Sequence, residues 1–199
     1  MTQVGLLLSG GMDSYALTFM ERPDITVTIN YGQKPADAEL RASKILTDRL
    51  NIQHLTISVD LSALGSGDLA GVPAIEDAPA SDWWPYRNQA LITLAAMRLI
   101  PCGIKHLLIG SVETDSIHLD GTKNFIQATS NLLSMQEGGM KVRAPAINMS
   151  TVDLIKKSGI PYSLLAWAHS CHTSNIACGQ CRGCVKHREI VTELGYAEA

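Results

Sequence analysis

Hydrophobic positions along the chain follow two periods in turn, and this pattern predicts alternating strands and helices. Four apolar or alternating runs are typical of buried strands, at residues 4–8, 24–30, 52–59 and 105–110. Apolar residues at helical spacing follow them, at residues 15–20, 35–50, 90–100, 123–136 and 151–157. A short crossing segment is expected at residues 144–147. The alternation predicts an α/β fold with a parallel sheet covered on both faces, and ligands bound at the carboxyl ends of the strands.

One long stretch lacks any period. Residues 60–82 are rich in glycine, proline and aspartate, and they are too many for a simple connection. A lid, a partner-binding segment and a merely mobile loop are the alternatives for this stretch. The rest of the chain predicts one α/β domain over residues 1–165, followed by a metal-binding segment over residues 166–199.

Composition and charge narrow the class of protein. The chain has 199 residues, 46% of them hydrophobic, which is enough for a globular domain with a substantial core. A net charge of −3 gives no general attraction to nucleic acid or anionic membranes, so neither is expected as a partner. No apolar run approaches the length of a membrane span, and the N-terminus does not resemble a signal peptide. We therefore expect a cytoplasmic protein.

The turn after the first predicted strand has the composition of an anion site. It reads Ser9-Gly10-Gly11-Met12-Asp13-Ser14 and leads directly into a predicted helix. The two glycines allow backbone N–H groups to face one point, the serines add hydroxyl groups, and the positive end of the helix dipole lies behind them. No Gly-Lys-Ser/Thr sequence follows, so the turn is not a Walker loop. An ordinary glycine turn capped by Asp or Ser is the simpler alternative.

Four of the five cysteines gather near the C-terminus, at Cys171, Cys178, Cys181 and Cys184. Clustered thiolates in a cytoplasmic chain favour a metal over disulfides, and four of them suit tetrahedral Zn²⁺. An iron–sulfur cluster is the competing interpretation. Four protein ligands leave no open position for water, so the predicted role of the metal is structural.

Histidines and basic residues surround the cysteines. His169, His172 and His187 flank the cluster, and one of them could replace a cysteine ligand, although second-shell or solvated positions are favoured. A basic group follows at Arg182, Lys186 and Arg188. The favoured interpretation is a solvated helix face, and the alternative is that it steers an anionic substrate.

The turn and the motifs after it carry a resemblance to a known family. The sequence SGGMDS resembles the loop of the PP-loop ATP pyrophosphatases, which split ATP into AMP and pyrophosphate. Together with the motifs at residues 31–33, 85–88, 115–125 and 170–184, it is similar to the 7-cyano-7-deazaguanine synthases, the QueC family. The resemblance implies an adenine nucleotide alpha-hydrolase-like, Rossmann-like fold. It also implies an ATP-dependent ligase that couples 7-carboxy-7-deazaguanine to ammonia, giving an amide and then a nitrile, with Mg²⁺ accompanying ATP and Zn²⁺ as structural metal.

The resemblance also implies roles for particular residues. The implied catalytic residues are Asp13, Ser14 and Arg87. The implied ATP-binding residues are Leu8, Ser9, Gly10, Gly11, Met12, Asp13, Ser14, Tyr31 and Gly110. The implied substrate-binding residues are Arg87, Asn88, Asp115, Asp120 and Phe125. The implied zinc ligands are Cys171, Cys178, Cys181 and Cys184.

Departures from the family pattern keep several alternatives open. Residues 115–123 are shorter than the corresponding family segment and lack its aromatic residues and proline, which leaves nucleobase binding and the nitrile-forming step open. QueC-like proteins of CBASS-type antiviral defence are implied to join the activated carboxylate to a protein amine, so a protein acceptor is one alternative. A PP-loop tRNA-modifying enzyme is another alternative. Its reactive thiol would have to be Cys102, which the sequence pattern indicates to be a buried structural residue. A non-catalytic nucleotide-binding scaffold and a homodimer also stay open.

Overall fold

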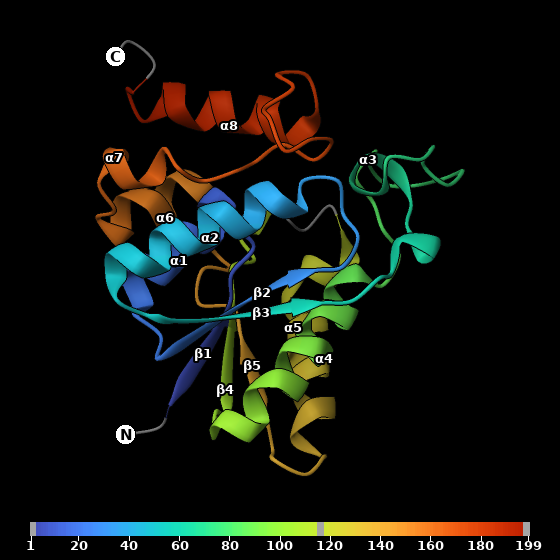
Figure 1. Ribbon diagram of the computed structural model, residues 1–199, viewed down its shortest axis with the longest axis vertical. Helices are drawn as coiled ribbons and strands as arrows, with labels where there is room; N and C mark the ends of the chain where they lie inside the picture. The colour runs from blue at the N-terminus through green and yellow to red at the C-terminus, as the bar shows by residue number, and fades with distance from the viewer. Residues whose placement is uncertain (1–2, 115–117, 197–199) are drawn as a thin grey trace.

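A five-stranded sheet forms the centre of the computed structural model, which describes residues 3–114 and 118–196 (Figure 1). Its strands are β1 (Val4–Leu7), β2 (Ile25–Asn30), β3 (Gln53–Ser58), β4 (His106–Ile109) and β5 (Lys141–Arg143). All neighbouring strands are parallel, in the order β3-β2-β1-β4-β5. The predicted α/β fold with a parallel sheet is therefore confirmed. The last strand precedes the crossing segment expected at residues 144–147, where the chain instead turns.

The predicted helices are present, and the described residues contain three further α-helices. The helices are α1 (Met12–Glu21), α2 (Ala36–Leu50), α3 (Gly67–Ala70), α4 (Arg87–Leu99), α5 (Lys123–Ser134), α6 (Thr151–Ser158), α7 (Tyr162–Leu165) and α8 (Arg182–Glu193). Local sequence determines where several of them begin. At α6, the Ser150 hydroxyl accepts a hydrogen bond from the Asp153 backbone N–H at 3.0 Å and so caps the N-terminus of the helix.

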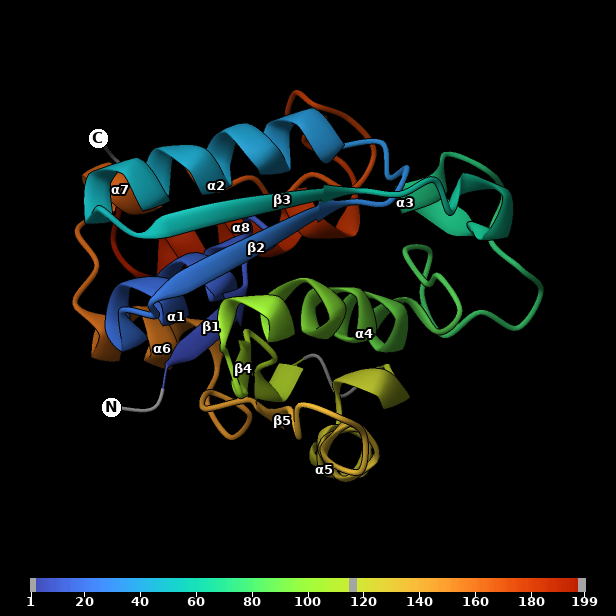
Figure 2. The same cartoon turned by 60° about the horizontal axis from the view of Figure 1, so that its bottom comes forward.

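Two hydrophobic cores hold helices against the two faces of the sheet (Figure 2). On one face, Leu6 of β1 lies among buried side chains of α1, α2 and α6, including Tyr15. On the other face, Val27 of β2 lies among buried side chains of α4 and α5, including Ile92. Each large apolar side chain that is fully buried contributes about 1.5–3 kcal/mol of transfer free energy. Two separate cores therefore fix the sheet between its helices.

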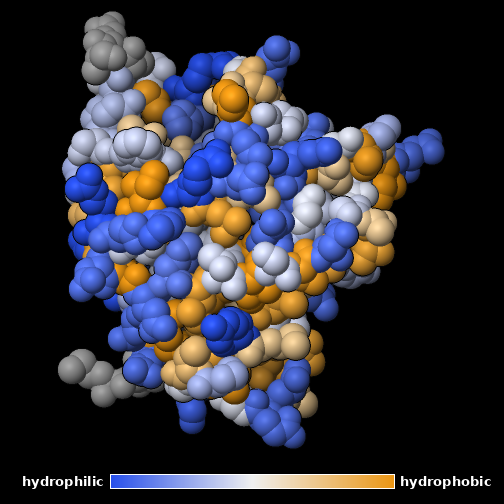
Figure 3. Space-filling view, viewed as in Figure 1, coloured by the Kyte–Doolittle hydropathy of each residue, from blue (hydrophilic) through white to orange (hydrophobic). Residues whose placement is uncertain are grey.

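Strand β3 forms one edge of the sheet, and none of its residues is fully buried. Leu55 and Ile57 are half-buried, whereas Gln53, Thr56 and Ser58 are exposed. Apolar side chains accordingly reach the surface in this region of the molecule (Figure 3). No helix in the described part of the chain combines the length and apolar character needed to cross a membrane.

Strand order places the glycine turn at a special point of the sheet. The connections from β1 lead to β2 on one side, whereas β4 pairs on the other side of β1. The order of the strands therefore reverses at β1, and open parallel sheets bind ligands at such a switch point. The turn of residues 9–14 follows β1 at its carboxyl end, which is where the sequence predicted an anion site.

Candidate active site

A cavity of about 340 Å³ opens at the carboxyl ends of the strands. Segments that are distant in sequence form its walls: the turn after β1, Tyr31 after β2, Gly110 after β4, the start of α4, and the cysteine-rich segment with α8. Leu69 and Asp82, from the aperiodic stretch of residues 60–82, also line it. This stretch therefore contributes a wall of the cavity as well as connecting β3 to α4.

Glycine at position 10 is required by the local geometry of the turn. Gly10 has a φ of 78°, in the left-handed region, and a Cβ added there would lie 2.7 Å from the carbonyl oxygen of Glu39. Gly11 is the N-cap of α1 and provides no side-chain hydrogen bond to it. Ser14 Oγ donates to the Gly11 carbonyl at 2.9 Å and lies 3.1 Å from Ser9 Oγ. The N-terminus of α1 therefore faces the cavity uncapped by a side chain, with two hydroxyls beside it, as an anion site requires.

The end of β4 lies directly against this turn. A Cβ added to Gly110 would lie 3.1 Å from both the backbone nitrogen and the Cα of Ser14. On the other side, Leu8 accepts a hydrogen bond from the Thr28 hydroxyl at 2.7 Å, which ties the end of β1 to β2. The turn is therefore held by both neighbouring strands and cannot spread without displacing them.

Asp13 pairs with a lysine from the C-terminal segment. Lys186 Nζ lies 3.3 Å from Asp13 Oδ2, and both side chains line the cavity. Arg182, one helical turn earlier in α8, also lines the cavity. Both side chains are partly exposed, at 40% for Arg182 and 37% for Lys186, yet both line the cavity, whereas Arg188 does not. A solvated helix face therefore describes only part of the environment of these two residues. The reason is that Ile190, on the same stripe of α8, is buried in the core beside α1 and turns the stripe inward.

Arg87 and Glu39 bring opposite charges to a second wall of the cavity. Burial raises the pKa of Glu39 to about 7, although a hydrogen bond from Gln33 Nε2 at 2.8 Å and the charge of Arg87 act in the opposite direction. Burial disfavours the charged form of Arg87, but nearby Tyr31 and the neighbouring carboxylates raise its pKa overall. A permanent cation therefore lies beside a carboxyl group that titrates near neutrality.

We expect Glu39→Gln to change how stability depends on pH. The raised pKa means that the folded state binds more protons than the unfolded state between the unfolded pKa, about 4.3, and about 7. Wild-type stability contributed by this group therefore declines as pH rises through that window. Glutamine removes the titration and can still accept the bond from Gln33. The free energy of unfolding is measured with urea at about pH 5 and about pH 8. Relative to wild type, the variant should be more stable at pH 8 than at pH 5. An equal difference at both pH values would contradict the assignment.

Asp82 joins the stretch before α4 to the cysteine-rich segment. Its Oδ1 accepts a hydrogen bond from Arg182 at 2.9 Å, and its Oδ2 lies 3.7 Å from His118 Nε2 and from His172 Nδ1. Burial alone would raise the pKa of Asp82, but nearby His118 and the charges of His172 and Arg182 hold it well below its usual range. The carboxylate is therefore ionised and ties three separate segments together at the cavity.

We expect Asp82→Asn to cost about 1–3 kcal/mol of unfolding free energy, because it removes the carboxylate from a pair that is buried on the Asp82 side. Arg182 is 40% exposed, so solvent screens its charge and keeps the cost below that of a fully buried pair. Urea denaturation in a double-mutant cycle with Arg182→Met measures the coupling. Additive effects of the two substitutions would show that the pair contributes nothing.

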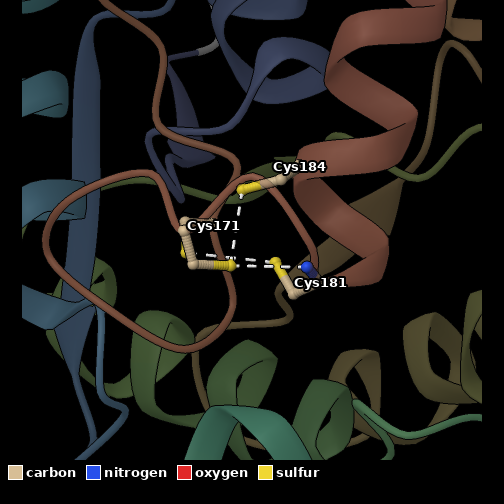
Figure 4. Close-up of side chains that lie close together, drawn as sticks. Cys171, Cys181 and Cys184 are labelled. Carbon is tan, nitrogen blue, oxygen red and sulfur yellow. Dashed lines mark hydrogen bonds between the residues drawn. The ribbon is translucent and has the colours of Figure 1, made fainter.

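The four cysteines converge as one metal ligand set. Their sulfur atoms all lie within 4.8 Å of one another, and the sulfurs of Cys171, Cys181 and Cys184 point toward a common centre (Figure 4). Cys178 Sγ lies 3.9 Å from Cys184 Sγ, and Cys181 Sγ lies 3.9 Å from Cys171 Sγ. A tetrahedral zinc with Zn–S bonds of about 2.3 Å would separate its sulfur ligands by about 3.8 Å. The predicted ligand set therefore fits zinc.

Hydrogen bonds to sulfur favour the thiolate form of Cys178. Bonds from Thr173 and from the backbone N–H groups of Cys181 and Gln180 lower the pKa of Cys178 to about 5. The flanking histidines have other partners: His169 Nε2 lies 2.9 Å from the Ser174 carbonyl oxygen and His187 Nδ1 lies 3.0 Å from Ser170 Oγ. The four sulfurs could therefore supply a complete tetrahedral set without a histidine.

The cysteine-rich segment packs closely on the start of α8. A Cβ added to Gly183 would lie 1.9 Å from the carbonyl oxygen of Ser170, so only glycine allows this approach. The backbone N–H of His169 also donates to the Gly10 carbonyl at 2.8 Å. A metal held by the cysteines would therefore hold Arg182 and Lys186 in place at the cavity.

Most of the predicted ATP- and substrate-binding residues line this single cavity. They are Leu8, Ser9, Gly11, Met12, Asp13, Ser14, Tyr31, Arg87, Asn88 and Gly110. Asp120 lies outside the cavity lining: its carboxylate accepts from the Asn88 backbone N–H at 3.3 Å, near the N-terminus of α4. Phe125 is also outside the lining and packs beside the second core. Asp115 lies outside the described residues.

Four charged residues that line the cavity were not among the predicted site residues. Glu39 and Asp82 come from two separate segments, and Arg182 and Lys186 come from α8. A signal existed for two of them. Glu39 lies in the first turn of α2, the helix that follows β2, and polar residues that follow parallel strands gather at one edge of the sheet. Lys186 lies four residues before the apolar Ile190, a spacing that places both on one face of a helix. No local pattern marks Asp82.

Comparisons with known proteins agree over nearly the whole chain. A family model described as "Queuosine biosynthesis protein QueC" matches residues 3–195. A protein named 7-cyano-7-deazaguanine synthase from Methylococcus capsulatus is 28% identical, over 97% of this chain and 95% of its own. A protein of the same name from Pseudomonas savastanoi is 27% identical, over 97% of this chain and 93% of its own. Another from Methanobrevibacter smithii is 25% identical, over 92% of this chain and 89% of its own.

Proposed function

This chain belongs to the QueC family, and from that premise we propose that it converts 7-carboxy-7-deazaguanine, ammonia and ATP into 7-cyano-7-deazaguanine. The observation that carries the proposal is the position of the SGGMDS turn. It leads into the N-terminus of α1 at the switch point of the sheet, and it shares one cavity with Arg87 and the cysteine-rich segment.

The chemistry explains why ATP is needed. A carboxylate is a poor acyl donor, because its oxide is a poor leaving group. Attack of a carboxylate oxygen on the α-phosphorus of ATP forms an acyl adenylate and releases pyrophosphate. Ammonia then attacks the acyl carbon, AMP leaves, and a proton is lost, which gives the amide. Adenylation of the amide oxygen by a second ATP, followed by loss of AMP and a proton, gives the nitrile.

The described residues suit the first of these steps. The N-terminus of α1, with Ser9 and Ser14, would hold the leaving pyrophosphate through backbone N–H groups and hydroxyls. Arg87 lines the same cavity and would orient the substrate carboxylate toward the α-phosphorus. Asn88, beside it on α4, offers an amide to the deazaguanine ring. Enclosing these groups would also keep water from the adenylate.

Two metal ions belong to the proposal in different roles. Asp13 would hold the Mg²⁺ that accompanies ATP, because a bare carboxylate would repel the phosphates. Mg²⁺ supplies neutralisation of phosphate charge. Cys171, Cys178, Cys181 and Cys184 would hold Zn²⁺ in a closed set, so its contribution is structural.

The tRNA-thiolation alternative would use Cys102 as its reactive thiol, because Cys171, which lines the cavity, belongs to the four-cysteine cluster. Cys102 is half-buried beside the second core, its sulfur lies 3.7 Å from the Arg98 carbonyl oxygen, and it does not line the cavity. A reactive cysteine would have to lie near the ATP phosphates. This observation favours the carboxylate as the group that is activated.

An isotope experiment tests the activation step. The protein is incubated with ATP, Mg²⁺, ammonia and 7-carboxy-7-deazaguanine whose carboxylate carries ¹⁸O, and AMP and pyrophosphate are measured. We expect both products to depend on the deazaguanine, and the AMP to contain ¹⁸O from the carboxylate. Tight ATP binding without substrate-dependent pyrophosphate would instead indicate a nucleotide-binding scaffold, and AMP without ¹⁸O would exclude carboxylate adenylation.

A further inference from the structure

Lys186 has a position that the proposed chemistry does not yet explain. It lies on α8, the helix that contains Cys184, and its side chain reaches the first turn of α1. Its Nζ lies 3.3 Å from Asp13 Oδ2, at the N-terminal end of a helix that no side chain caps. The two residues are 173 positions apart in sequence, so the fold, and not local structure, brings this ammonium group to the turn.

The turn itself lacks enough positive charge for a triphosphate. Residues 9–14 supply hydroxyls and backbone N–H groups but contain no lysine or arginine. The helix N-terminus is equivalent to roughly half a positive charge, and the Asp13 carboxylate opposes it. A nucleotide that carries several negative charges therefore needs a cation from elsewhere in the fold.

Of the described residues that line the cavity, three carry a permanent positive charge: Arg87, Arg182 and Lys186. Arg182 is bonded to Asp82 at 2.9 Å, and Arg87 lies close to Glu39 and Tyr31. Lys186 is the one for which the ion-pair partner lies on the turn itself. Its side chain is 37% exposed, and a partly solvated pair of this kind contributes only about 0–1 kcal/mol. Exchanging Asp13 for another anion therefore costs little.

We infer that Lys186 is a phosphate-binding residue of the nucleotide site: it pairs with Asp13 before ATP arrives and with the β- and γ-phosphates afterwards. This inference rests on the proposed use of ATP. A flexible four-carbon stem with three donors allows the ammonium to follow the phosphates, while Asp13 becomes accessible to the magnesium ion. The cysteine-rich segment then has a direct part in nucleotide binding, because it positions α8.

Binding measurements without the deazaguanine test the inference. Calorimetry compares wild type, Lys186→Gln and Lys186→Arg with two ligands in the presence of Mg²⁺: the α,β-methylene analogue of ATP, which cannot be split at that bond, and AMP. Lys157→Gln is the matched control, because Lys157 is an exposed lysine on α6 away from the cavity. Metal content and thermal melting establish that each variant is folded.

We expect Lys186→Gln to weaken binding of the ATP analogue by about tenfold to hundredfold while AMP affinity is unchanged, because AMP lacks the β- and γ-phosphates. Lys186→Arg should retain most of the affinity, and Lys157→Gln all of it. Equal losses for both ligands, or no loss, would overturn the inference.

A second readout uses the wild-type protein alone. The ATP analogue should protect Lys186 from an amine-acetylating reagent, detected by peptide mass spectrometry, whereas AMP should not. Protection by both ligands or by neither would count against phosphate contact. Since no deazaguanine is present, a failure of nitrile formation with these binding results intact would count against the proposed function only.

Discussion

Asp13→Ala should lower substrate-dependent pyrophosphate release by about 10²- to 10³-fold, the effect expected when one group that stabilises the transition state electrostatically is removed. Asp13 lies in the first turn of α1, lines the cavity and faces Lys186 at 3.3 Å. Without its carboxylate, the Mg²⁺ of the nucleotide loses its proposed protein ligand. Initial rates of pyrophosphate release under saturating ATP provide the measurement.

The fold should survive this substitution. Lys186 is partly exposed, so water can solvate its ammonium when Asp13 is removed, and we expect a change in unfolding free energy of about 1 kcal/mol or less. Asp48→Ala is the control, because Asp48 forms a surface pair with Lys44 on α2 at 2.8 Å. Wild-type turnover in Asp13→Ala, or an equal loss in Asp48→Ala, would contradict the role assigned to Asp13.

Removal of the metal should unfold the C-terminal segment and abolish turnover. Structural zinc in small peptides contributes about 10–16 kcal/mol of apparent binding free energy, which is comparable with the stability of a whole domain. Here the cysteine sulfurs would hold the start of α8, whose Arg182 and Lys186 line the cavity. Chelation should therefore lower the melting temperature and remove ATP-analogue binding together.

Substitution of single cysteines separates the metal site from general damage. Cys181→Ser should lose bound metal, whereas Cys102→Ser should keep it, because Cys102 is not one of the four clustered cysteines and packs against the second core. Elemental analysis should find zinc. The visible absorption of an iron–sulfur cluster should be absent. A metal-free protein that melts and turns over like the wild type would disprove the structural role.

Much of the fold follows from local patterns. The buried strands are apolar or β-branched, as in Val27 and Ile29 of β2, and the helices have clear apolar stripes, so sheet and helices could be predicted. Strand β5 has three residues with Val142 as its only apolar one, too little for a strand pattern. It forms because β4 presents an edge with which it can pair.

The candidate site was predictable where its residues are close together in the sequence. The turn at residues 9–14 and the four cysteines are short motifs, and each is compact in the structure. Contacts across the fold were not predictable. The closeness of Asp13 to Lys186 and of Asp82 to Arg182 depends on where α8 packs in the fold. That position involves the buried Ile190 and a close approach at Gly183. Charged residues at those positions resemble a solvated helix face when the sequence is considered alone.

The most direct test of the proposed function is mass spectrometry of the deazaguanine product. The protein is incubated with 7-carboxy-7-deazaguanine, excess ATP, Mg²⁺ and ¹⁵N-labelled ammonia, and with a candidate protein acceptor in a parallel reaction. We expect the final product to be 7-cyano-7-deazaguanine that carries one ¹⁵N, with an amide of the same label as its precursor. An amide that accumulates without nitrile, a deazaguanine attached to protein, or no product at all would contradict the proposed function.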